Sequence, residues 1–295
     1  MRDKVPVLFG EVLFDCFEDG SRVLGGAPFN VAWHLHAFGC QPLFISRVGE
    51  DPWGRKIRDT MQHWGMSTVG LQKDSVHHTG EVSITLQQGQ PSFEILPDRA
   101  YDHIQAEDLP SMNPSLVYHG SLGLRQADAA NTLTTLLQRH HAPVFMDVNL
   151  RPPWWEQDRV GQLLDRARWV KINDAELKML VAEGDDLQTK AETLMQRHDL
   201  TWAIVTRGAM GAFALDVVGN LHTIEPAAQV QVVDTVGAGD AFASVCILGL
   251  LQDWPLAQTL ERAQQFASLL VSQRGATIPD MVTYQPFIQA WNIKQ

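Results

Sequence analysis

Short apolar runs alternate with longer amphipathic stretches along most of the chain. Each run is followed within a few residues by turn-forming residues and then by a helical pattern of apolar positions. Such alternation is typical of parallel βαβ units, in which helices cover both faces of one sheet. The runs predicted to form strands are Val5–Phe9, Pro42–Val48, Leu116–His119, Val144–Val148, Trp169–Ile172 and Trp202–Thr206.

Two of the predicted helices have well-marked boundaries. Pro28 suits the first turn of a helix, and Gly39 ends that helix. The apolar side chains that share its buried face are Val31, Ala32, Leu35 and Phe38. A second helix is expected to open at Asp51 and to continue to about Trp64.

Two segments break this rhythm. Val12–Leu24 and Thr79–Leu96 each have the pattern of two short strands around a polar turn, at residues 18–21 and 88–91. Hairpins of this size are not stable alone, so both must pack on another part of the protein. No internal repeat, low-complexity tract or linker divides the chain, which predicts a single domain over residues 1–295.

The bulk composition narrows the class of protein. Of 295 residues, 45% are hydrophobic and 19% are charged, which is typical of a globular chain. The formal net charge of −11 argues against non-specific binding to nucleic acid or to an anionic membrane. The start of the chain lacks a long apolar core, and no apolar stretch reaches about 18 residues, so neither secretion nor membrane spanning is expected. Three scattered cysteines fit a reducing compartment, which predicts a cytoplasmic protein.

The segment Asp234–Phe242 carries the clearest chemical signature. Its sequence, Asp-Thr-Val-Gly-Ala-Gly-Asp-Ala-Phe, places a Gly-Ala-Gly turn directly before a long apolar run. Such a turn brings backbone N–H groups together, and a helix start adds unpaired N–H groups and the positive end of its dipole. The same field is expected to keep Asp240 ionised on the first helical turn. A carboxylate base beside an anion-binding turn is what phosphoryl transfer to an alcohol requires, although an ordinary strand-to-helix turn with a capping acid has the same sequence.

Polar residues also follow several predicted strands, at the edge where open α/β sheets bind ligands. Asp15 follows the first strand, and its alternative role is that of a solvated acid. In Asp147–Trp154, the guanidinium of Arg151 can hold a phosphate oxygen or a substrate hydroxyl, or pair with Asp147 across the loop.

Two further motifs have both a functional and a purely structural interpretation. Asn173 and Glu176 follow the strand Trp169–Ile172, and their spacing is also that of a helix N-cap and its capping-box partner. The glycines of Thr206–Gly211 follow another strand and alone would suit any tight turn.

Taken together, these motifs resemble the ribokinase-like sugar kinases of the phosphofructokinase B type. Asp234–Phe242 is similar to the C-terminal signature of that family, and Gly25–Ala32 (Gly-Gly-Ala-Pro-Phe-Asn-Val-Ala) to its N-terminal signature. The resemblance implies a three-layer α/β/α fold with a mostly parallel central sheet and a small β-sheet lid, inserted at about residues 12–24 and 77–104. It implies ATP-dependent transfer of the γ-phosphoryl group to a primary hydroxyl of a small sugar.

The resemblance also implies roles for single residues. Asp240 would deprotonate the accepting hydroxyl beside an anion hole formed by Gly237, Ala238 and Gly239. The residues implied to bind sugar are Asp15, Gly25, Gly26, Asn30 and Arg151, and those implied to lie against ATP are Asn173, Thr206, Gly208 and Gly211. Glu176 would help to fix Mg²⁺ through water. Asp234 would begin a loop that binds a monovalent cation, K⁺, together with a second loop near Gly275.

The acceptor is expected to be fructose. The Gly-Gly-Ala-Pro start, Ala100–Asp102 and the Arg-Pro-Pro-Trp run at 151–154 look most like bacterial fructokinases. The first alternative is a 2-keto-3-deoxygluconate kinase, in which Arg99 or Arg151 would neutralise a substrate carboxylate, and the next is a nucleoside or aminoimidazole-riboside kinase. A non-catalytic sugar-binding regulator on the same fold is the alternative from a different class. Because lids of two subunits often clasp in this family, a homodimer through the lid is a further expectation.

Other nucleotide-binding and metal-binding motifs are missing from the sequence. It contains no G-x-x-x-x-G-K-[ST], and no G-x-G-x-x-G opens the first helix, which argues against a P-loop kinase and a Rossmann dehydrogenase. The pairs His77-His78 and His140-His141 lack the spacing of helical metal ligands and are predicted to be solvated.

Overall fold

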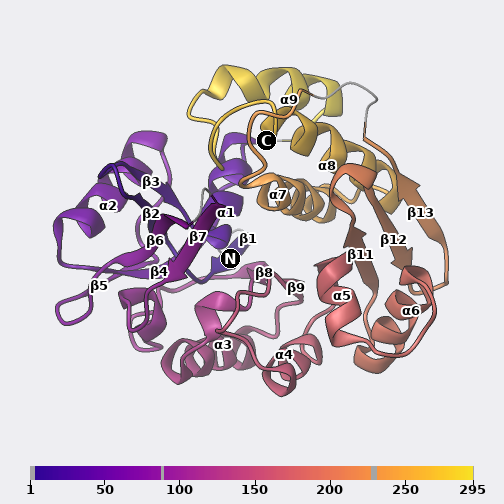
Figure 1. The fold of residues 1–295 in the computed structure, drawn as a ribbon, viewed down its shortest axis with the longest axis horizontal. Helices are drawn as coiled ribbons and strands as arrows, with labels where there is room; N and C mark the ends of the chain where they lie inside the picture. The colour runs from indigo at the N-terminus through magenta and orange to yellow at the C-terminus, as the bar shows by residue number, and fades with distance from the viewer. Residues whose placement is uncertain (1–3, 88–89, 227–230, 295) are drawn as a thin grey trace.

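The computed structural model describes residues 4–87, 90–226 and 231–294, and within them a nine-stranded sheet forms the centre of the molecule (Figure 1). Neighbouring strands of this sheet are parallel except at one edge, where the last two strands are each antiparallel to the strand before them. In spatial order the strands are β13 (Leu221–Ile224), β12 (Ala212–Asp216), β11 (Trp202–Thr206), β10 (Trp169–Asn173), β9 (Val144–Asp147), β8 (Pro114–His119), β1 (Val5–Phe9), β4 (Leu43–Gly49) and β5 (Leu71–Asp74).

Helices cover both faces of this sheet and bury a separate apolar core on each (Figure 1). One face carries α1 (Ala27–Ala37), α2 (Pro52–Trp64), α7 (Ala238–Leu251), α8 (Leu256–Leu270) and α9 (Gln285–Trp291). The other carries α3 (Ala127–His140), α4 (Gln157–Leu164), α5 (Asp174–Leu180) and α6 (Leu187–His198). Within the described residues the chain also forms four short 3₁₀ helices: η1 (Ala100–His103), η2 (Leu122–Leu124), η3 (Gly208–Met210) and η4 (Met281–Tyr284). The predicted three-layer α/β/α architecture is confirmed.

Two helices from opposite ends of the chain pack against each other at the centre of one layer. All of α1 except His36 is buried, and α7 is buried continuously from Ala241 to Gly249. Helices that are apolar all round belong in a protein interior, and α1 and α7 contact each other directly.

A second, four-stranded sheet lies beside the main one, in the order β3-β2-β6-β7. Its strands are β2 (Leu13–Phe17), β3 (Arg22–Gly25), β6 (Gly80–Gln87) and β7 (Gln90–Ile95). The two insertions predicted from the sequence meet where β2 pairs with β6 in parallel. Residues 88–89 of the predicted second turn lie outside the described residues.

One face of this small sheet carries an apolar row. Phe17, Ile84 and Phe93 are partners in neighbouring strands, so their side chains lie on the same face. Ile84 is buried, whereas Phe17 and Phe93 are 40% and 61% exposed.

In the described part of the chain, no helix combines the length and apolarity needed to cross a bilayer.

Candidate active site

The strands of the parallel part of the sheet end at one edge, where several predicted site residues meet. Glu11 follows β1, Asn173 ends β10 and Thr206 ends β11. The N-termini of α1 and α7 meet, because Asn30 Nδ2 donates to Asp240 Oδ2 at 2.8 Å. They lie at the same edge as Glu11, since a Cβ at Gly26, the residue before α1, would lie 2.7 Å from the Glu11 carbonyl oxygen. The N-terminal and C-terminal motifs therefore form one site.

The predicted anion-binding turn opens directly onto α7. Gly237 is the residue before the helix and has φ 78°, in the left-handed region. A Cβ there would lie 2.4 Å from Ala276 Cα, so only glycine fits. The N–H of Ala238 donates to the Thr235 carbonyl at 3.3 Å. The N–H groups of Gly239 and Asp240 are in the first turn, where no carbonyl of the helix can accept from them. They are therefore donors for an anion at the positive end of a 14-residue helix.

Asp240 is partly buried beside this turn, and its environment raises its pKa to about 6. Burial is the main cause, while the hydrogen bond from Asn30 and the charges of Lys171 and Arg151 oppose it. Desolvation therefore outweighs the helix dipole in setting this pKa, although a pKa of about 6 still leaves Asp240 mostly ionised at neutral pH, as expected. A pKa near neutrality suits a general base.

A buried ion pair that the sequence analysis missed lies beneath the anion-binding turn. Lys171 Nζ is 2.7 Å from Asp147 Oδ2, and the two side chains are 7% and 3% exposed. Although burial opposes its charge, Asp147 raises the pKa of Lys171, so the ammonium stays protonated. A Cβ at Gly239 would lie 3.4 Å from this ammonium, which places a fixed positive charge next to the turn.

Arg151 is exposed and does not pair with Asp147, whose partner is Lys171, so the predicted alternative for Arg151 is wrong. Its Nη1 donates to the carbonyl of Leu150 at 3.2 Å. Burial raises the pKa values of Asp15, Glu11 and Asp240, and the charge of Arg151 opposes each rise. Arg151 therefore faces the same space as these three acids.

The remaining predicted sugar-binding residues lie on the lid side of Asp240. A Cβ added at Gly25 would lie 4.0 Å from both Asn30 and Asp15 Oδ2, so the three positions surround one small space. Asn30 Oδ1 is buried and lacks a hydrogen-bond partner. Burial raises the pKa of Asp15 to about 6, and Arg151 opposes the rise. Asp15 is thus half-buried and not the solvated acid of the alternative.

A second acid that the sequence analysis did not single out, Glu11, lies at the same site. Its side chain is 2% exposed, and Oε2 has no hydrogen-bond partner. Burial raises the pKa of Glu11 to about 7. A buried acid directly after a central strand is a signal that sequence reading could have used, because such acids are rare unless they are paired or functional.

Asn173 and Glu176 form the capping box that was considered as the alternative to a metal role. Asn173 Oδ1 accepts from Glu176 N at 2.8 Å, and Glu176 Oε2 accepts from Asn173 N at 3.0 Å. Glu176 Oε1 also accepts from Leu150 N at 2.8 Å, so the acid ties α5 to the loop that carries Arg151. The structural role is confirmed.

Thr206, Gly208 and Gly211 form the connection between β11 and the antiparallel β12. Gly211 has φ 77°, and a Cβ there would lie 2.0 Å from the Ile224 carbonyl oxygen. The tight-turn interpretation of these glycines is therefore confirmed, and the turn lies at the same sheet edge as Asn173.

Asp234 ties the segment before the anion-binding turn to the loop around Gly275. Its Oδ2 accepts from Gly275 N at 3.0 Å, and its Oδ1 from Val236 N at 3.0 Å. The predicted proximity of these two loops is thus present.

The loop after Gly275 is held from below by α1. His34 is fully buried, which lowers its pKa to about 4 and leaves the ring neutral. Its Nε2 donates to the Ala276 carbonyl at 3.0 Å, because a carbonyl only accepts, and Nδ1 accepts from the Tyr284 hydroxyl at 2.8 Å. Since Ala276 packs on Gly237, the helix that carries Asn30 also supports the anion-binding turn.

Comparison with known proteins decides the family. The model of the pfkB family carbohydrate kinases matches residues 16–283. The chain belongs to this family. It is therefore a phosphotransferase with an alcohol group as acceptor. A fructokinase of Klebsiella pneumoniae is 31% identical over 94% of this chain and 95% of its own length.

Two solved structures show the same ribokinase-like fold as this kinase. One is a double mutant of fructokinase from Vibrio cholerae O395 with bound fructose, ADP and potassium ion, with 25% identity, 94% coverage of each chain and a TM-score of 0.81. The other is an aminoimidazole riboside kinase from Salmonella enterica, with 24% identity, coverage of 97% of this chain and 100% of that chain, and a TM-score of 0.82. The fold is thus shared by kinases of different acceptors.

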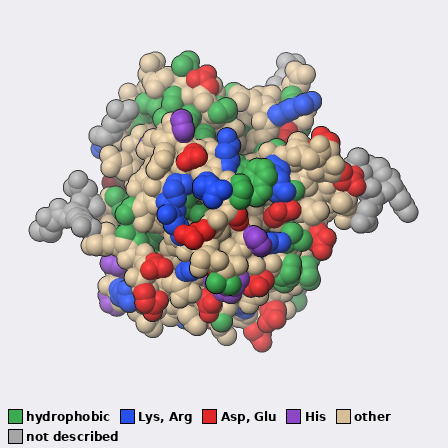
Figure 2. Space-filling model, turned by 90° about the vertical axis from the view of Figure 1, so that its left-hand side faces the viewer, with side chains coloured by type: hydrophobic (Ala, Val, Ile, Leu, Met, Phe, Trp, Pro, Cys, Tyr) green, Lys and Arg blue, Asp and Glu red, His purple; other side chains and the backbone are tan. Residues whose placement is uncertain are grey.

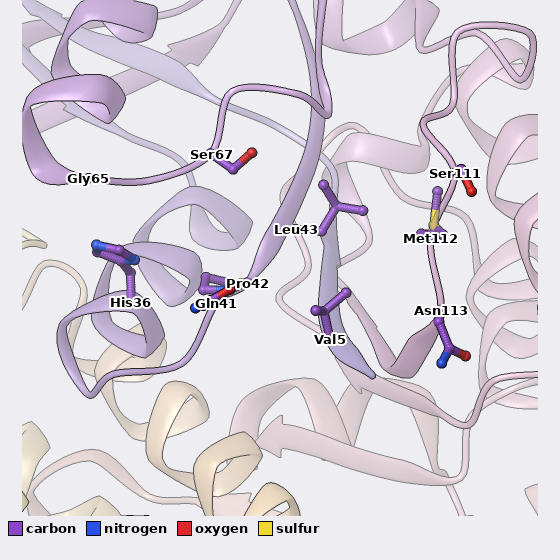
Figure 3. Close-up of a pocket in the computed structure, with 10 residues that line it drawn as sticks. All are labelled: Val5, His36, Gln41, Pro42, Leu43, Gly65, Ser67, Ser111, Met112 and Asn113. Atoms are coloured by element: carbon purple, nitrogen blue, oxygen red, sulfur yellow. The ribbon is translucent and has the colours of Figure 1, made fainter. Parts of the chain in front are cut away.

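A cavity elsewhere on this kinase is not part of the site. Its volume is about 410 Å³, and its lining includes Val5, Leu43 and Asn113 (Figure 3). These residues begin β1 and β4 and precede β8, so the cavity lies at the amino ends of the strands, opposite Asp240. The face in Figure 2 carries a central group of Lys and Arg side chains with acidic side chains beside it.

The two adjacent glycines are expected to respond differently to alanine. Gly25→Ala places a methyl group between Asn30 and Asp15 without a steric clash, so we expect KM for the sugar to rise with little loss of stability. Gly26 has φ 113°, and a Cβ there would lie 2.7 Å from the Glu11 carbonyl oxygen. Gly26→Ala is therefore expected to destabilise the fold by about 1–3 kcal/mol. Thermal unfolding together with sugar titrations checks both, and an unchanged KM in Gly25→Ala would contradict the placement of the sugar.

Glu11→Gln is expected to stabilise the protein in a pH-dependent way. The pKa of Glu11 is about 7 in the folded state and near 4.5 when unfolded, so the folded state binds its proton more tightly. Stability from this group is present at low pH and is lost as pH rises from about 4.5 to about 7. The neutral glutamine avoids this loss, with a gain of about 1–3 kcal/mol near pH 8 and almost none near pH 4. Urea unfolding at both pH values measures the difference, and an equal gain at both would contradict it.

Proposed function

We propose that this carbohydrate kinase transfers the γ-phosphoryl group of ATP to a primary hydroxyl of fructose. The observation that carries the proposal is the hydrogen bond of 2.8 Å between Asn30 and Asp240, because it joins the polar space between Asp15 and Asn30 to a carboxylate at an anion-binding turn. The fructokinase relative from Klebsiella pneumoniae and the Vibrio cholerae fructokinase with fructose and ADP support this acceptor.

In the proposed reaction Asp240 accepts the proton of the sugar hydroxyl as its oxygen attacks the γ-phosphorus. Asp15 and Asn30 orient the sugar, because a carboxylate and an unpaired amide oxygen accept hydrogen bonds from hydroxyls. The first-turn N–H groups of α7 and the ammonium of Lys171 stabilise the negative charge of the transferred group. Asn173, Thr206, Gly208 and Gly211 are proposed to lie along the nucleotide, on the strand ends beyond Lys171.

Mg²⁺ is the proposed metal for this reaction, and its fit can be judged from Glu176. Both oxygens of this acid already accept backbone hydrogen bonds, which suits a contact through water better than direct coordination. Mg²⁺ retains several waters in most protein sites, so the residue present fits. When bound, the ion would neutralise charge on the phosphate oxygens.

K⁺ is proposed to lie between the loop of Asp234 and the loop of Gly275, which the hydrogen bond from Gly275 N to Asp234 Oδ2 holds together. The potassium ion in the Vibrio cholerae fructokinase structure supports this proposal. Equal activity in sodium, potassium and tetramethylammonium buffers would remove it.

An assay of ADP release across several acceptors tests the substrate. Fructose should be turned over with the highest kcat/KM, ahead of ribose, 2-keto-3-deoxygluconate, adenosine and aminoimidazole riboside. If another acceptor is phosphorylated and fructose is not, the protein is a kinase of that acceptor and not a fructokinase. Stabilisation by a sugar without any ADP release would instead indicate a non-catalytic regulator.

The apolar row Phe17–Ile84–Phe93 is proposed to join two copies of the chain through their lids. Exposed aromatic side chains in a row on a β-sheet face favour an interface. Sedimentation at micromolar concentration should then show a dimer, and Phe93→Ser should release monomers.

The free cysteines Cys16, Cys40 and Cys246 support a reducing compartment, for which we propose the cytoplasm.

A further inference from the structure

A cluster of two histidines and three aspartates lies at the base of the β6–β7 hairpin, away from Asp240. In the described part of the chain, His77, Asp98 and His103 are the group of three whose ligand atoms all lie within 4.8 Å of one another. His77 precedes β6, Asp98 follows β7 and His103 ends η1. The two His rings are 24% and 20% exposed, so His77 is not the solvated residue expected from the sequence.

Both imidazoles direct the same nitrogen toward one carboxylate. Asp98 Oδ1 is 2.8 Å from His103 Nε2 and 3.7 Å from His77 Nε2. The side chain of Asp98 is 73% exposed and can move toward solvent. The two rings are stacked, with centroids 3.6 Å apart and planes 12° apart.

The other nitrogen of each ring is held by a carboxylate of its own. His77 Nδ1 is 3.0 Å from Asp74 Oδ2, and His103 Nδ1 is 2.9 Å from Asp128 Oδ2. Metal-binding histidines almost always donate their second N–H to such a carboxylate, which fixes the tautomer and leaves Nε2 as the ligand. Two such outer carboxylates on two neighbouring histidines are the observation that distinguishes this cluster from a chance surface pairing.

We propose that His77, His103 and Asp98 bind one divalent transition-metal ion with the ligand preference of zinc. Tetrahedral Zn²⁺, with bonds of about 2.0–2.2 Å, needs ligand atoms about 3.3 Å apart, and the two distances to Asp98 lie on either side of this value. Binding requires one ring to tilt out of the stack so that both lone pairs converge. A water completes the fourth position, since three protein ligands leave one open.

The charge of the cluster favours such an ion. Asp74, Asp98 and Asp128 bring three carboxylates to the cluster; Arg47, 2.8 Å from Asp74, offsets one of them, and the charge of Arg99 acts on Asp98.

The position of the site gives the ion a specific effect on the lid. His77 and Asp98 lie at the two ends of the β6–β7 hairpin. His103 ends η1, which contacts β4 and α3 of the main body although it falls within the predicted lid segment 77–104. An ion that joins the three restrains the hairpin against the body. This effect on the lid rests on the proposed function, in which Asp15 on lid strand β2 orients the sugar.

Calorimetric titration of the metal-free protein with zinc chloride tests the site without any activity measurement. We expect one equivalent to bind to the wild type, Asp98→Asn and His103→Gln to abolish saturable binding, and Asp128→Asn to weaken it by about 10–100-fold. His198→Gln is the matched control, because His198 pairs with the single carboxylate of Asp165 at 2.6 Å and has no second histidine. The absorption of Co²⁺ in place of zinc reports whether nitrogen ligands are present.

Two outcomes would overturn the site. One is the absence of saturable zinc binding to the wild type near pH 8, and the other is equal affinity in the wild type, Asp98→Asn and His103→Gln. Asp98→Asn changes an exposed side chain, so its circular dichroism and melting temperature should match the wild type and separate ligand loss from unfolding. Failure of the fructokinase assay leaves the binding result unaffected, so the two proposals fail separately.

Discussion

Asp240→Asn is expected to lower kcat by about 10²–10⁴-fold or more, because an amide does not accept the proton of the sugar hydroxyl. The side chain keeps its shape, and its Oδ1 still accepts the hydrogen bond that Asn30 donates to Asp240 at 2.8 Å. The KM for ATP should therefore change little, and the melting temperature near neutral pH should not fall, because the neutral amide avoids the cost of burying the Asp240 charge. Steady-state kinetics with circular dichroism measures both, and a folded variant with unchanged kcat would contradict the role of Asp240 and the site built around it.

The pH profile gives an independent check on the same residue. The pKa of Asp240 is about 6, and the base acts only when it is deprotonated. The value of kcat/KM should therefore fall about tenfold per pH unit below about pH 6 and reach a plateau above it. Because Arg151 lowers this pKa, Arg151→Gln should move the acid limb to higher pH.

Lys171→Met is expected to have the largest effect on stability of any single change considered. It leaves the buried Asp147 carboxylate without its partner, at a cost of about 3–5 kcal/mol in unfolding free energy. It should also lower kcat, because a positive charge beside the anion-binding turn is lost. Chemical denaturation and steady-state kinetics measure the two effects.

The double variant Lys171→Met/Asp147→Asn separates structure from catalysis. With both charges removed, most of the stability should return, whereas kcat should remain low. Lys178→Met is the matched control, since Lys178 pairs with Asp174 at 3.1 Å on the surface and should cost less than about 1 kcal/mol. Full recovery of kcat in the double variant would show that Lys171 acts only as a structural partner of Asp147.

Much of the fold could be predicted because its strands and helices obey simple periodicities. Val5–Phe9 and Trp202–Thr206 form strands with the predicted bounds, and α2 is capped by Asp51 as its sequence indicates. The pattern missed β12 and β13, because they continue as antiparallel strands from the turn at Gly208–Gly211 without an intervening helix. It also missed β5, whose sequence Leu-Gln-Lys-Asp is short and has three polar residues among four.

The parts of the site that one continuous segment forms could be predicted from its sequence. The parts that depend on contact between two distant segments could not. The anion-binding turn needs only Gly237 and the helix after it, so its sequence was sufficient. Lys171 lies in an apolar strand, and its role can be recognised only from the strand register that places it opposite Asp147 on β9. The raised pKa of Asp240 depends on burial by distant residues, which a local dipole argument omits.

The packing of α1 against α7 has a consequence for how this polypeptide matures on the ribosome. α1 is complete once residue 37 has been made, yet the buried helix that covers it, α7, ends at Leu251. For most of synthesis the nascent chain therefore carries an uncovered apolar helix, which is a natural substrate for chaperones. A polypeptide released before α7 is finished should aggregate and not persist as a partly active fragment.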